Sequence, residues 1–224
     1  MNLINSKIRK VEIDGINEWV WPEEDEGAWE GPSESWPLFR EAIIKNVDNF
    51  NICVQAGGNL GLYPRLLSQM FNFVFTYEPD FVNFEYLKIN TEHAANVFAY
   101  NSALGETKGT LQLQSGPPDN FGMHKIVFEN TFNTTTVPVT TIDIDHSTTG
   151  CDLIFLDIEN YEYYALKGAL LTIKQHKPVV IVENETTDIR EFLIQLGYRT
   201  PTKITPHDSI FVHKDKLHLV ASNM

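Results

Sequence analysis

The sequence predicts an α/β fold built on a doubly wound, mostly parallel sheet, with an antiparallel last strand and a β-rich insert. From residue 51 onward, short and nearly continuous apolar runs alternate with amphipathic stretches of helical period. Strands that are apolar along their whole length are buried on both faces, as in parallel sheets covered by helices on each side. Two segments interrupt this alternation. Residues 109–137 predict the insert, and residues 208–214 predict the last strand.

The predicted elements follow the chain in order. The strand candidates are residues 51–55, 73–78, 96–104, 151–157 and 178–185. The helix candidates are residues 60–70, 80–92, 161–176 and 186–197. A further apolar run, 208–214, follows the last helix and predicts a hairpin-like end to the sheet. Ligands of such folds bind beyond the carboxyl ends of the parallel strands, which is where we expect the site.

Residues 109–137 form the insert, which shows no helical pattern. The stretch "TLQLQ" alternates with a period of two, and Gly116-Pro117-Pro118 breaks the run. These features predict β-structure. We expect it to lie beside the ligand crevice and to help shape it.

Residues 1–48 differ from the main domain, 49–224, because they contain all four tryptophans. Several prolines and glycines are expected to prevent long regular elements there: Pro22, Gly27, Gly31, Pro32 and Pro37. A helix is predicted to follow up to Val47, capped by Ser33 or Ser35. Its apolar face would contain Leu38, Ala42, Ile43 and Val47. The tryptophan-rich extension is interpreted either as core packing or as a lid over the site.

Composition excludes several functional classes. Seventeen basic and thirty acidic residues give a formal net charge of −13, which argues against nucleic acid as a partner and weakly favours a neutral or cationic ligand. Cys53 and Cys151 begin predicted buried strands and are interpreted as core residues in a reducing compartment. The chain shows no apolar signal segment and no run of about 18 apolar residues, so we expect a cytoplasmic protein without a membrane partner.

The segment "NICVQAGGNLGLYPRLL", residues 51–67, predicts a strand, a tight turn at Gly57-Gly58 and a helix. A turn without side chains next to a helix N-terminus lets a charged ligand contact backbone N–H groups. Glu78 ends the next strand at the spacing of a carboxylate that accepts ribose hydroxyls. Both NAD and S-adenosylmethionine carry an adenosine, so Glu78 alone does not distinguish them.

Five motifs, taken together, distinguish S-adenosylmethionine from NAD. They are Gln55-Ala56-Gly57-Gly58-Asn59-Leu60-Gly61, Tyr77-Glu78-Pro79, Asn101-Ser102-Ala103-Leu104-Gly105, Thr141-Ile142-Asp143, and Leu156-Asp157-Ile158-Glu159-Asn160-Tyr161-Glu162 with Leu166-Lys167-Gly168-Ala169. In this order, over roughly residues 50–213, the sequence resembles the FkbM-type family of S-adenosylmethionine-dependent methyltransferases, which have the class I methyltransferase fold.

The resemblance implies an enzyme that methylates oxygen, with a hydroxyl of a sugar or another small polar molecule as the acceptor. It also implies S-adenosylmethionine as the cofactor. The cofactor-binding residues it implies are Gln55, Gly57, Gly58, Asn59, Gly61, Glu78, Ser102, Ala103 and Asp157.

Two positions depart from the family pattern. Gln55 replaces an aspartate of the first motif, and Asn160 replaces a glycine. Because the Gln55 amide carries no charge, three interpretations stay open: weaker cofactor binding, compensation by Asp157, or a site that has lost catalysis. Asparagine tolerates left-handed backbone conformations, so the turn at Asn160 is expected to be unchanged.

The chemistry points to acids at the strand ends. Methyl transfer from a sulfonium requires an aligned acceptor and removal of the hydroxyl proton. Asp157 ends an apolar strand and Glu159 follows it, so both are predicted to be catalytic. A divalent cation held by Asp157, Glu183 and Asn184 is an alternative that we do not favour. Glu183 and Asn184 would otherwise cap the next helix, and Glu159 would otherwise match a helix dipole.

Two functions of other classes remain as alternatives. One is a non-catalytic module of the same fold that binds an adenosine ligand or a partner, which Gln55 motivates. The other is an NAD(P)-linked enzyme. The seven histidines show no zinc-site spacing.

Overall fold

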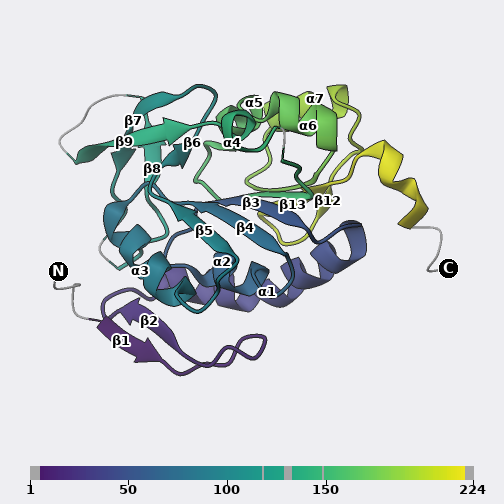
Figure 1. Cartoon of the computed structure of the whole chain (residues 1–224). Coiled ribbons are helices and arrows are strands. Elements are labelled where there is room, and N and C mark those ends of the chain that lie inside the picture. Colours follow the sequence, from purple (N-terminus) through teal and green to yellow (C-terminus); the bar gives the residue numbers. More distant parts are fainter. Residues whose placement is uncertain (1–5, 118, 129–132, 148, 220–224) are drawn as a thin grey trace.

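The computed structural model describes residues 6–117, 119–128, 133–147 and 149–219 (Figure 1). Its main feature is a seven-stranded sheet in the order β12-β13-β11-β10-β3-β4-β5. The parallel strands are β3 (Ile52–Ala56), β4 (Phe73–Tyr77), β5 (Val97–Tyr100), β10 (Leu153–Leu156) and β11 (Val179–Glu183). At the far edge, β13 (Asp208–Phe211) runs antiparallel to β11, and β12 (Thr202–Lys203) antiparallel to β13. The predicted fold class is therefore confirmed.

Helices cover both faces of this sheet (Figure 1). On one side lie α1 (Gly27–Asn46), α2 (Leu62–Leu67) and α3 (Phe81–Thr91). On the other lie α4 (Ile142–His146), α5 (Glu162–Lys167), α6 (Leu170–His176) and α7 (Thr187–Gln195). A 3-10 helix, η1 (Lys214–Leu219), follows the last strand. Each layer has its own apolar cluster because β3 and β10 are buried on both faces. None of the described helices combines the length and the apolar character needed to cross a bilayer.

The insert is a second sheet, which confirms the predicted β-structure. Its strands are β6 (Ala103–Leu104), β7 (Gly109–Gln114), β8 (Lys125–Val127) and β9 (Thr134–Thr140), in the order β6-β9-β7-β8. Residues 118 and 129–132 of the predicted insert lie outside the described residues. The single strand predicted at 96–104 is divided, because β5 belongs to the main sheet and β6 to the insert.

The N-terminal segment corrects one prediction. A hairpin of β1 (Ser6–Arg9) and β2 (Trp19–Pro22) precedes α1, a helix of 20 residues that runs through Pro32 and Pro37. The prolines therefore do not prevent a long helix, although each removes one backbone donor. The Ser33 hydroxyl donates to the Glu30 carbonyl, which satisfies one acceptor in this stretch.

Burial of aromatic side chains stabilises α1 in spite of its prolines. The helix buries Trp29, Trp36, Phe39 and Ile43, whereas Leu38, predicted on the apolar face, is 49% exposed. The Phe39 ring lies 5.0 Å from the Phe155 ring of β10, measured between centroids. The N-terminal tryptophans belong to the same apolar cluster as this face of the sheet, so they pack as core residues.

This packing predicts a large difference between adjacent positions of α1. Phe39→Ala should lower the free energy of unfolding by about 3–5 kcal/mol, because it removes a buried ring and leaves a cavity. Leu38→Ala, the matched control on the exposed face, should change it by less than about 0.5 kcal/mol. Urea denaturation measures both values. Equal losses at the two positions would contradict the observed orientation of α1.

Candidate active site

A cavity of about 340 Å³ opens at the carboxyl ends of β3, β4, β10 and β11. Its walls include the start of α1, the glycine turn after β3, the insert segment 120–126, the turn between β12 and β13, and residues that follow the strand ends. This is the edge of the sheet at which doubly wound folds bind ligands. The volume is in the range of small-molecule sites.

The glycine turn leaves no room for side chains. Gly57 has φ 79°, and a Cβ added there would lie 1.8 Å from the carbonyl oxygen of Asp157. A Cβ on Gly58 would lie 2.3 Å from Cδ1 of Leu87. The two glycine N–H groups donate to the Tyr77 carbonyl at 3.1 and 3.0 Å. The turn is therefore pressed between the ends of the two neighbouring strands, β4 and β10, and forms a backbone floor for the cavity.

The Gln55 side chain supports this glycine turn from within the sheet. It is completely buried and does not line the cavity. The Nε2 group donates to the carbonyls of Ala56 and Gly57 at 3.0 and 2.8 Å, and Oε1 accepts from the Thr76 hydroxyl. An amide is suited to this place because it both donates and accepts, which a carboxylate does not.

Glu78 lies on the cavity wall directly after β4. Its Oε2 accepts from the Asn59 N–H at 2.7 Å, and its Oε1 accepts from the Asp80 N–H at 2.8 Å. Burial raises the pKa of Glu78 to about 7, although both N–H contacts favour the ionised form. Each carboxylate oxygen has a second acceptor position, so the side chain can also accept ligand hydroxyls.

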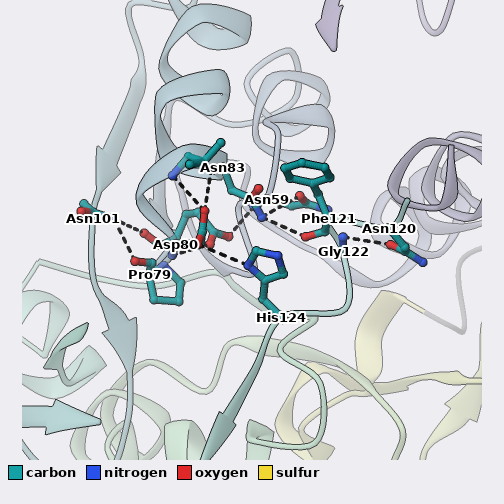
Figure 2. A network of polar contacts seen from close by, with 11 residues as sticks. Asn59, Pro79, Asp80, Asn83, Asn101, Asn120, Phe121, Gly122 and His124 are labelled. Carbon is teal, nitrogen blue, oxygen red and sulfur yellow. Dashed lines mark hydrogen bonds and ion pairs between the residues drawn. The ribbon is translucent and has the colours of Figure 1, made fainter. Parts of the chain in front are cut away.

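A network of polar contacts joins Asn59, Asp80 and Asn83 to insert residues 120–124, here called the roof of the cavity (Figure 2). Asn59 in turn donates its backbone N–H to Glu78. Asn83 donates to Oδ1 of Asn59 at 3.2 Å and to the Phe121 carbonyl at 2.9 Å. Its own Oδ1 is buried and has no hydrogen-bond partner within the described part of the chain. Asn83 itself lines the cavity, so its side chain links the cavity wall to the Phe121 backbone.

The roof itself is held by charged groups. Asp80 caps α3 through the N–H groups of Val82 and Asn83 and pairs with Nδ1 of His124 at 3.4 Å. Burial alone would lower the pKa of His124, but the adjacent Asp80 carboxylate outweighs it and the pKa is raised. The insert is thereby held against the end of β4.

Four carboxylates, here called the acidic group, line the other half of the cavity: Asp157, Glu159, Glu183 and Asp208. Burial, followed by repulsion from Glu183 and Asp208, holds the pKa of Asp157 far above its usual range. Burial and then repulsion from Glu159 and Asp208 raise the pKa of Glu183 to about 7. Interaction with the Asp157 side chain partly offsets the rise in the pKa of Glu183.

The cavity brings together most of the residues predicted from the sequence. Those that line it are Gly57, Gly58, Asn59, Glu78, Ala103, Asp157, Glu159 and Glu183. Those that do not are Gln55, Gly61, Ser102 and Asn184. Gly61, with φ 94°, instead shapes the start of α2. Asn160 has φ 72°, which confirms the predicted left-handed turn.

Several cavity residues were missed by sequence reasoning, among them Asn83, His124, Tyr161 and Asp208. Asp208 had a usable pattern, because it begins the predicted last strand. Antiparallel pairing sets it opposite Glu183, but this register is not visible in the sequence. Among the described residues, no group of three or more histidine, cysteine, aspartate or glutamate side chains is arranged to hold a metal ion, and this includes the acidic group.

Comparison with known families identifies one match within the chain. The FkbM methyltransferase domain matches residues 67–200. A comparison with curated protein sequences finds no significant match.

Solved structures share the fold. A methyltransferase FkbM from Methylobacillus flagellatus aligns with a TM-score of 0.50 and 17% identity, over 82% of this chain and 60% of that one. The Pyrococcus abyssi tRNA (uracil-54, C5)-methyltransferase, solved with S-adenosyl-L-homocysteine, aligns with a TM-score of 0.51 and 10% identity, over 92% and 43%. The ribosomal protein L11 methylase of Lactobacillus delbrueckii subsp. bulgaricus aligns with a TM-score of 0.50 and 9% identity, over 84% of this chain and 81% of that one. The chain thus spans about 60% of the length of the Methylobacillus protein.

The position of Gln55 predicts the effect of restoring the family's acid. Gln55→Asp should lower the free energy of unfolding by about 1–3 kcal/mol, because two buried carbonyls lose their donor and face a carboxylate. It should not strengthen cofactor binding. Denaturation and calorimetry with S-adenosylhomocysteine measure the two effects. The exposed Gln195→Asp at the end of α7 controls for the change of residue type. A stable Gln55→Asp protein that binds more tightly would show that Gln55 faces the cofactor.

Proposed function

Because the chain belongs to the FkbM methyltransferase family, we propose that it transfers a methyl group from S-adenosylmethionine to a hydroxyl oxygen of a sugar or another small polar acceptor. One observation carries this proposal. A single cavity is lined both by the glycine turn with Glu78 and by the acidic group. A bound cofactor and a group that accepts a proton would therefore share one enclosed space.

The residues of the first half of the cavity fit S-adenosylmethionine. The turn at Gly57 and Gly58 presents backbone without side chains to the cavity, and Glu78 has free acceptor positions for ribose hydroxyls. When bound, the cofactor supplies an electrophilic methyl group on a sulfonium. Asp157 directly follows β10, at the junction between the two halves, and would lie near the cofactor's positive charge.

The acidic group supports removal of the acceptor's proton. A general base works best when its pKa is close to the working pH, and Glu183 has a pKa of about 7. Interaction with the Asp157 side chain limits the rise in the pKa of Glu183, and Glu159 lines the same cavity. A cavity with this many carboxylates disfavours anionic acceptors, which agrees with a neutral hydroxyl compound and with a net charge of −13.

The alternative functions receive less support. The case for a non-catalytic module came from the missing charge at Gln55, but this side chain supports the turn and does not line the cavity. Membership of the FkbM family favours S-adenosylmethionine over NAD(P). The proposed transfer assigns proton removal to the carboxylates of the acidic group.

The first test concerns the cofactor. Glu78→Ala should weaken the binding of S-adenosylhomocysteine by about 2–3 kcal/mol, because charge-assisted hydrogen bonds to the ribose hydroxyls are lost. Isothermal calorimetry measures the affinity. Glu92→Ala, at the exposed end of α3, is the matched control and should bind normally. Unchanged affinity in Glu78→Ala would show that Glu78 does not bind the ribose hydroxyls.

The second test concerns transfer. With labelled S-adenosylmethionine and a panel of methyl glycosides and polyols, the rate should rise with pH through about 7, because the ionised fraction of Glu183 rises there. Glu183→Gln should lower the rate by about 10²–10⁴-fold and should abolish this pH dependence. Exposed Glu191→Gln on α7 should retain both. A Glu183→Gln protein with the full rate and the same pH profile would rule out Glu183 as the base.

A further inference from the structure

A second cavity, of about 220 Å³, lies between the insert sheet and the start of α5. Tyr161 lines both this cavity and the larger one, so it is the wall that the two share. We propose that the second cavity is the acceptor subsite and that it receives the ring of a neutral pyranose, stacked on the exposed face of Phe128. This inference rests on the proposed methyl transfer and adds to it the place where the acceptor is held.

An aromatic group forms one side of the cavity. The Phe128 side chain is 70% exposed, yet its ring is held by two others. Its centroid lies 5.5 Å from that of Tyr164, edge to face, and 6.1 Å from that of Tyr161. The two tyrosine rings stack on each other at 4.8 Å. They support Phe128 from behind and leave the Phe128 ring largely open, which suits the apolar C–H face of a sugar ring.

The polar side of the cavity carries no net charge. Glu106 contributes a carboxylate, but Nζ of Lys167 neutralises it at 2.6 Å. The remaining polar lining includes the hydroxyls of Thr107 and Thr110. Hydroxyls next to a paired carboxylate can donate and accept hydrogen bonds with a polyol. A cationic ligand would need an unpaired carboxylate or a cage of open aromatic faces, whereas here the tyrosine faces are turned toward each other.

The backbone keeps Tyr161 between the two cavities. Glu159 and Asn160 both have positive φ, 54° and 72°, so the chain turns sharply between Asp157 and Tyr161. Gly105 lies against the Tyr161 ring, since a Cβ there would be 3.6 Å from Cε1 of Tyr161 and only 2.9 Å from Cγ1 of Val139. In this proposal the seated ring extends a hydroxyl past Tyr161 toward the acidic group.

The test uses the full chain and a panel of methyl glucoside, galactoside and mannoside in saturation-transfer NMR, with and without S-adenosylhomocysteine. At least one pyranoside should receive saturation on its ring protons. Phe128→Ala should weaken its binding by about tenfold, the expected worth of one aromatic contact. Phe128→Tyr should restore it, because the ring face is kept. Phe98→Ala on β5 removes another exposed ring, 40% exposed, and is the matched control that should bind as the unmodified protein does.

In the transfer assay, Phe128→Ala should raise the acceptor KM about tenfold and leave the affinity for S-adenosylhomocysteine unchanged. The subsite is refuted if no pyranoside receives saturation, if Phe128→Ala binds like the unmodified protein, or if tetramethylammonium binds in place of the sugars. Failure of the unmodified protein to bind S-adenosylhomocysteine would instead refute the proposed function. Binding of the cofactor product without any effect at Phe128 refutes the subsite alone.

Discussion

The close approach of Gly57 to the end of β10 is the constraint on which the site depends. No side chain fits between the turn after β3 and the Asp157 carbonyl, because a Cβ would lie 1.8 Å from that oxygen. Gln55 holds the same turn from within the sheet through two donated hydrogen bonds. Fixed in this way, the turn has Glu78 on one side and Asp157 on the other, so the two halves of the cavity meet at a rigid backbone floor.

The N-terminal segment and the insert close the cavity together, although they are far apart in the sequence. Asp25 is completely buried and accepts from Nε1 of Trp21 and from the Phe121 N–H, both at 2.7 Å. The N–H groups of Glu26 and Gly27 donate to the Asp119 carbonyl. Since Phe121 also contacts Asn83, the roof in Figure 2 is continuous with the helix that follows Glu78. The same N-terminal segment is therefore both core and cavity wall.

The parts of the fold that the sequence predicts are those that follow from local apolar pattern. The parallel strands were found because each is an apolar run, and the insert because "TLQLQ" alternates. The length of α1 was missed, since the cost of Pro32 and Pro37 is local whereas the burial of Trp36 and Phe39 against the sheet is not. The single helix predicted at 161–176 is divided into α5 and α6 at Gly168, where a Cβ would lie 1.9 Å from the Gly105 carbonyl oxygen of the insert.

The site residues, too, were predicted where local sequence pattern identifies them and missed where their position depends on a neighbouring strand. Motif spacing identified Glu78, Asp157 and the glycine turn, which lie at strand ends. It gave no indication that Gln55 points away from the cavity, because the direction of one side chain depends on Thr76 in the neighbouring strand. Asp208 joins the acidic group only through antiparallel pairing. The most direct measurement is a crystal structure with S-adenosylhomocysteine. The account predicts ribose hydroxyls within hydrogen-bond distance of Glu78 and the sulfur facing Asp157; a nucleoside bound away from Glu78 and the Gly57 turn would contradict it.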